Sequence, residues 1–121
     1  MNKEETKKAL AEINYRISVV KSSISSLEEQ KQRIKVDVSK IISDKNDRLK
    51  RLQKEITNTK VSKAKTIKRA SRDREKKSFE NNLENKRKQI QNIDTQIINK
   101  RKEISDLGVI KQKIRLAETS I

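Results

Sequence analysis

Apolar residues recur every three or four positions along two long stretches of the chain, and this spacing predicts two α-helical arms. Because a helix turns once every 3.6 residues, each apolar row lies on one side of its helix, as in the seam of a coiled coil. The first row is Leu10, Ile13, Ile17, Val20, Ile24, Leu27, Ile34, Val38 and Ile41. The second row is Phe79, Leu83, Ile90, Ile93, Ile97, Ile104, Leu107, Ile114 and Ile121.

The first row changes its spacing once. After Ile41 it continues at Lys45 and Leu49, so that two steps of four residues follow one another, and it then reaches Leu52 and Ile56. Such a stutter locally unwinds a left-handed supercoil. We interpret it as an accommodation of helix geometry within a continuing seam.

The two arms are expected to pair with each other in an all-α, antiparallel coiled-coil hairpin. We treat residues 1–121 as one coiled-coil unit, with a first helix at 1–57, a bend at 58–62 and a second helix at 63–121. Folding about residue 60 makes the arms equal and places the following residues opposite each other: Ile13 and Leu107, Leu27 and Ile93, Ile41 and Phe79, Ile56 and Ala64, Leu52 and Ile67, Leu49 and Ala70. A continuous coiled-coil rod is the alternative.

The bend is predicted from side chains that compete with helix formation. Thr57, Asn58 and Thr59 favour caps and turns, and Ser62 is placed to cap the second helix. A second cap-rich stretch at residues 43–47 is a rival position, but the later bend makes the arms equal.

The composition suits long helices better than a globular core. The chain has no proline and one glycine, Gly108, which stays in register with Leu107 and Ile114 and is either a helix end or a tolerated helical glycine. Charged residues make up 40% of the chain, whereas only 31% are hydrophobic and 2% aromatic. That is enough apolar surface for a seam between helices.

Most kinds of active site are excluded by what the chain lacks. It has no histidine and no cysteine, so the commonest general base, the thiolate nucleophile and the usual transition-metal ligands are missing. We therefore expect no catalytic residues, no metal site, no cofactor and no enzymatic activity. No apolar run approaches the ~20 residues that span a membrane, and the first residues lack the apolar core of a secretory signal. We expect a cytoplasmic protein, with export without a cleaved signal as the alternative.

Positive charge is concentrated in the middle of the chain. Residues 57–78 carry nine basic and two acidic side chains, which is +7 of a total formal charge of +15. We name the nine cations the basic block and predict that they bind a partner: Lys60, Lys63, Lys65, Lys68, Arg69, Arg72, Arg74, Lys76 and Lys77.

Lysines also occupy the predicted seam, at Lys31, Lys86, Lys100 and Lys111. A lysine can extend its ammonium group out of a seam, or it can meet an acidic helix from a partner. Further apolar residues lie beside the seam and widen it, which also suits a homo-oligomer of three or four helices: Val19, Val36, Ile42, Ile98, Val109, Ile110 and Leu116.

Nucleic acid is the rival partner for the basic block. Residues 60–107, a basic run followed by a heptad arm, resemble the basic-region leucine-zipper family. The run contains no counterpart of that family's base-reading asparagine, and its zipper positions are Phe79, Lys86, Ile93, Lys100 and Leu107. It could neutralise phosphates without reading sequence, but Tyr15 and Phe79 provide no platform for stacking bases.

Over its whole length the chain resembles the small helical-hairpin accessory partners of type VII secretion toxins. It has two long helices of similar length and no cysteine, but Asn58-Thr59-Lys60 stands at the bend in place of the Trp-X-Gly motif. The resemblance implies a protein that binds the helical domain of a toxin side by side. The chain is similarly close to the stalk proteins of type III secretion, which are also basic helical hairpins.

These observations together predict a non-enzymatic coiled-coil interaction protein. Its expected partner is an acidic helical protein, for which it would act as an adaptor or chaperone of a secreted or assembling client. The alternative is an architectural protein that binds nucleic acid without sequence specificity.

Overall fold

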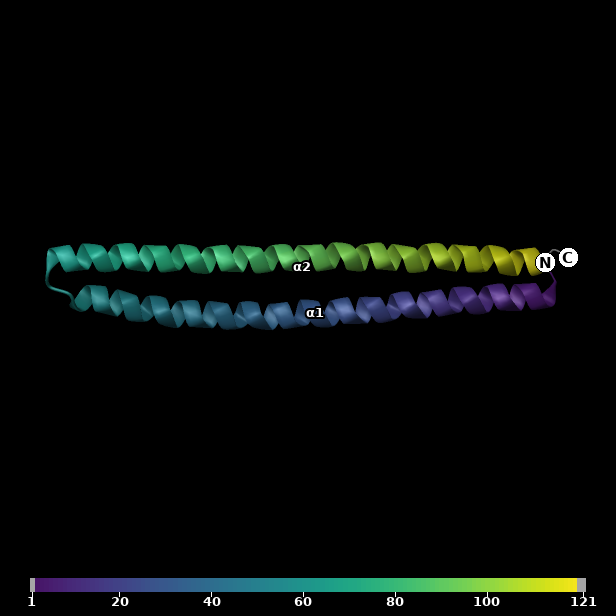
Figure 1. The fold of residues 1–121 in the computed structure, drawn as a ribbon, viewed down its shortest axis with the longest axis horizontal. Helices are drawn as coiled ribbons and strands as arrows, with labels where there is room; N and C mark the ends of the chain where they lie inside the picture. Colours follow the sequence, from purple (N-terminus) through teal and green to yellow (C-terminus); the bar gives the residue numbers. More distant parts are fainter. Residues whose placement is uncertain (1, 120–121) are drawn as a thin grey trace. The chain divides into compact units, whose positions relative to one another are not determined.

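The chain forms an all-α helical hairpin. The computed structural model describes residues 2–119, in which α1 (Lys3–Asn58) and α2 (Ser62–Thr119) are joined by a short bend and run antiparallel (Figure 1). The predicted hairpin is thus confirmed, and the continuous rod is not adopted. Ile121, the last residue of the second predicted apolar row, lies outside the described residues.

Threonine hydroxyls close the end of α1 at the bend. Thr57 and Thr59 donate hydrogen bonds from Oγ1 to the backbone carbonyl oxygens of Gln53 (2.9 Å) and Glu55 (2.7 Å). Each hydroxyl bonds to a carbonyl four residues earlier, a local side-chain-to-backbone hydrogen bond of the kind by which threonine competes with the continuation of a helix. The backbone N–H of Lys65 donates to the carbonyl oxygen of Val61 at 2.9 Å, so Val61 precedes α2 and Ser62 is its first residue instead of its cap. The rival bend at residues 43–47 lies inside α1.

The contacts within the hairpin group the chain into two compact units. Met1–Lys31 and Asn92–Ile121 make up the first, which we name the end unit, and Gln32–Gln91 make up the second, which we name the bend unit. Each unit contains one segment of α1 packed against one segment of α2.

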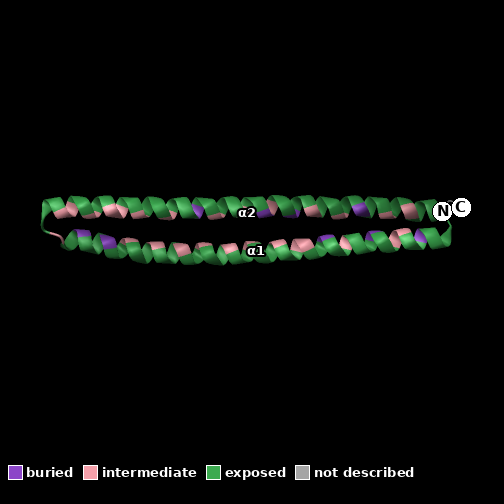
Figure 2. Ribbon diagram, in the orientation of Figure 1, coloured by how far each residue is buried: buried purple, intermediate pink, exposed green. Residues whose placement is uncertain are grey.

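In each unit the apolar seam lies between the two helices, and the outer sides are exposed (Figure 2). The buried seam residues of the end unit are Ile13, Val20, Ile93, Ile97 and Leu107, and those of the bend unit are Leu52, Ile56 and Leu83. The remaining members of the two predicted rows, as far as Ile114, are half-buried. The seven apolar residues beside the seam, from Val19 to Leu116, are exposed.

Ion pairs across the end unit neutralise part of the seam charge. Lys31 Nζ lies 2.6 Å from Asp94 Oδ1, and Arg101 Nη2 lies 3.2 Å from Glu28 Oε1. Lys31 is therefore paired within the hairpin, and its charge does not require an acidic helix from a partner.

The pairing of the two helices is displaced from the one expected for a bend centred on residue 60. That bend would place residue 72 opposite Arg48 and residue 89 opposite Lys31, but their partners are Glu75 and Asp94. The displacement is about one helical turn. In the bend unit, the first turn of α2 accordingly extends past the last turn of α1 (Figure 1).

The displaced register brings two stutters together. On α1, half-buried residues follow steps of four at Ile41, Lys45 and Leu49, as the sequence predicted. On α2, the same steps occur at Glu75, Phe79 and Leu83. A local unwinding of one helix is thus matched by its partner, which keeps the two seams in phase on both sides of the stutter.

The α2 stutter changes which residues face α1 near the bend. Ile67, expected opposite Leu52, is 60% exposed, and Ala70, expected opposite Leu49, is also exposed. These two pairings were wrong, because the inward side of α2 passes through Lys68, Arg72 and Glu75 instead. The displacement of about one turn also shifts the four other expected pairings, such as Ile41 with Phe79.

Gly108 lies within α2 and is therefore a tolerated helical glycine and not a helix end. A Cβ atom added there meets nothing within 4 Å. Replacing Gly108 by alanine is expected to raise the free energy of unfolding by about 0.5–1 kcal/mol, because alanine loses less backbone entropy in a helix. Thermal unfolding followed by circular dichroism measures the change, and an unchanged or lower midpoint would contradict it.

Candidate functional site

Most of the positive charge belongs to the bend unit. Residues 32–91 carry 20 Lys or Arg and 8 Asp or Glu, whereas the remaining residues carry 12 and 9. The net formal charges are therefore +12 for the bend unit and +3 for the end unit. A surface with this excess attracts acidic partners, and it does so over about 8 Å at physiological ionic strength.

Two members of the basic block face the hairpin. Lys68 donates from Nζ to Thr59 Oγ1 at 3.1 Å, and Arg72 donates from Nη1 to Gln53 Oε1 at 2.8 Å. Leu52 and Ile56 on α1 are nevertheless buried. We attribute this burial to the aliphatic stems of Lys68 and Arg72, which can cover apolar surface while their charged groups reach polar partners at the edge.

The other members of the basic block point mainly outward. Lys65 is half-buried, and the exposed members are Lys60, Lys63, Arg69, Arg74, Lys76 and Lys77. Between residues 2 and 119, neither an ion pair nor a side-chain hydrogen bond links Lys63, Arg74 or Lys77 to another side chain. The basic block thus divides into a part that belongs to the seam and a part that is available to a partner.

Three of the outward cations share one side of α2 with two exposed apolar residues. Lys63, Ile67, Ala70, Arg74 and Lys77 follow one another in steps of four, three, four and three, so they form one stripe along the helix. We name these five residues the outer stripe. No acidic residue occupies it. The apolar pair lies in its middle, with cations on both sides.

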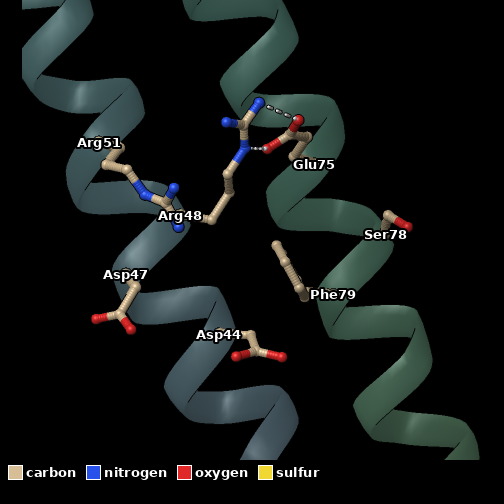
Figure 3. A pocket seen from close by; sticks show the side chains of 7 residues that line it. All are labelled: Asp44, Asp47, Arg48, Arg51, Glu75, Ser78 and Phe79. Carbon is tan, nitrogen blue, oxygen red and sulfur yellow. Dashed lines mark hydrogen bonds and ion pairs between the residues drawn. The ribbon is translucent and has the colours of Figure 1, made fainter.

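An open notch lies where the two stutters meet. It has a volume of about 460 Å³ and is lined by Asp44, Asp47, Arg48, Arg51, Glu75, Ser78 and Phe79. Figure 3 shows the Phe79 ring between the two helices, with Arg48 reaching from α1 to Glu75 on α2. The notch includes the stutter residues Glu75 and Phe79, and Phe79 is only half-buried there.

Arg48 and Glu75 form a bidentate pair across the notch. The guanidinium donates from Nε and Nη2 to the two carboxylate oxygens, at 3.1 and 3.2 Å. The hydrogen bond to Glu75 and the charge of that carboxylate raise the pKa of Arg48 above its ordinary value. Because arginine is already protonated at every ordinary pH, the shift does not make this pair a pH-dependent switch.

Ile67 is one of two residues of the outer stripe that sequence reasoning misplaced, the other being Ala70. The signal that could have located it is the α1 stutter, because an antiparallel partner needs a matching stutter opposite Lys45. Applied to α2, that requirement selects Glu75, Phe79 and Leu83 and moves Ile67 out of the seam.

The described residues hold no group of three or more acidic side chains that could bind a metal ion. Among them, no helix is long and apolar enough to cross a membrane. Comparison with known proteins adds no relative: no family model, no curated protein and no solved structure matches the chain.

Proposed function

We propose that the chain is a non-enzymatic interaction protein whose bend unit binds an acidic helical protein. The observation that carries the proposal is the net formal charge of +12 in the bend unit, where Lys63, Arg74 and Lys77 are exposed and form no ion pair within residues 2–119. Such cations repel one another in the unbound protein, and an acidic surface relieves that repulsion.

The hairpin is suited to act as an adaptor or chaperone for a secreted or assembling client. A helix of the client could lie along α2 and extend the two-helix assembly to three, as helices do in bundles. The resemblance to accessory partners of type VII secretion toxins suggests the same arrangement, and the toxin's helical domain would then be the client.

The proposal is tested by removing the outward cations that have no partner. Changing Lys63, Arg74 and Lys77 to glutamine is expected to weaken capture of the client severalfold, because charge-assisted contacts are lost while the seam is untouched. The measurement is affinity capture from nuclease-treated lysate of the source cells, with the retained proteins identified by mass spectrometry.

A matched control keeps the test specific. Lys102, Lys113 and Arg115 are also exposed on α2, but they belong to the end unit, and their change to glutamine removes the same charge. Retention of an acidic helical protein by this control, together with its loss from the first variant, supports the proposal. Loss of every partner after nuclease treatment would favour a nucleic-acid-binding protein instead.

A further inference from the structure

The outer stripe has a feature that positive charge alone does not explain. Ile67 is a large apolar side chain and is 60% exposed between Lys63 and Arg74, and Ala70 lies one turn further along. Because Ile67 is exposed, its side chain does not contribute to the packing between the two helices. It contributes to binding if a partner covers it.

We infer that the outer stripe binds an amphipathic acidic helix, with apolar side chains over Ile67 and Ala70 and carboxylates toward the cations at both ends. This inference rests on the proposed function and specifies the partner of the same surface. The stripe spans 15 residues from Lys63 to Lys77, which is a rise of about 21 Å and about four helical turns. A partner helix of similar length matches it.

The side chains of the outer stripe indicate where apolar and acidic side chains must lie along the partner helix. Ala70 is small, so a partner helix can approach α2 closely at the centre and place a leucine beside Ile67. Lys63 lies one turn before Ile67, and Arg74 and Lys77 lie one and two turns after Ala70. Acidic residues are therefore needed about one turn to either side of the apolar centre, so that the partner helix packs along the outer side of α2 with an apolar centre and charged ends.

Charge excludes a second copy of the bend unit as the occupant. Two bend units each carry a net formal charge of +12 and repel each other, and the outer stripe has no acidic residue that would reduce this repulsion. A phosphate backbone would neutralise the cations, but it has no apolar group to cover Ile67. The acidic amphipathic helix satisfies both the charge and the apolar centre.

The experiment uses two synthetic helical peptides of about 21 residues with the same net negative charge. One has leucines at its centre with glutamates one turn away on each side, and the other has glutamine in place of the leucines. Fluorescence anisotropy with the whole chain should show the leucine peptide binding about tenfold more tightly. Changing Ile67 to glutamine should remove most of that difference, and Ile67→Leu should retain it.

Ile98 supplies the matched control. It is an isoleucine of α2 that is 64% exposed, but it belongs to the end unit. Ile98→Gln should leave the preference for the leucine peptide unchanged. Circular dichroism checks that each variant keeps its helicity, which substitution at an exposed position should preserve.

The outcomes separate this inference from the proposed function. If both peptides bind equally, charge alone accounts for recognition, and the inference fails while the proposed function stands. If neither peptide binds, both fail. If neither binds but a DNA duplex does, with the same affinity for wild type and Ile67→Gln, the bend unit binds nucleic acid and both are overturned.

Discussion

Replacing Ile56 by alanine is expected to lower the free energy of unfolding by about 2–5 kcal/mol. Ile56 is 2% exposed, the lowest value among the apolar residues of the seam. Its loss removes apolar burial and leaves a cavity beneath Lys68 and Arg72, whose hydrogen bonds to α1 hold them in place. Because α2 offers no large apolar side chain at this level, little can move in to fill the space.

Chemical denaturation followed by circular dichroism at 222 nm measures this effect. Ile98→Ala is the control, because the same side chain is removed from a position that is 64% exposed. We expect the control to change the free energy by no more than about 0.5 kcal/mol. If the two substitutions lowered the free energy of unfolding equally, Ile56 would not be buried in solution. That result would contradict the packing described for the bend unit.

Engineered cysteines can test the displaced register of α1 against α2. The chain has no cysteine of its own, so a single pair can be introduced cleanly. Ile41→Cys combined with Leu83→Cys is expected to form a disulfide on mild oxidation, because the matched stutters place these positions opposite each other. A disulfide needs Cα atoms within about 7 Å, and helices in close contact at a seam can meet that limit with a small adjustment.

The competing register supplies the comparison. Pairing about residue 60 would instead place Ile41 opposite Phe79, so Ile41→Cys with Phe79→Cys serves as the second variant. The two registers differ by four residues, or about 6 Å along the helix. Non-reducing electrophoresis of both variants, diluted to prevent links between chains, gives the result. Faster closure of the 41–79 pair would reject the displaced register.

Arg72 shows why the sequence alone could not separate the cations of the basic block that bond to α1 from those that are available to a partner. Lys63 and Arg72 have the same sign of charge, and both lie in a run with nine cations. Only the register of α2 against α1 determines that Arg72 bonds to Gln53 while Lys63 stays on the exposed side. Substitutions aimed at binding should therefore avoid Lys68 and Arg72, because losses there mix folding with recognition.

The sequence by itself determined that this protein is two helices with a seam between them, because three-and-four spacing and the absence of proline are local properties of each helix. It also located the bend, since threonine and asparagine weaken a helix wherever they cluster. The register was decided only by tertiary structure, because two regular apolar rows can pair at several offsets one turn apart. The matched stutters and the ion pairs across the seam select one offset. That choice places Ile67 outside the seam, on the outer stripe with three cations of the basic block.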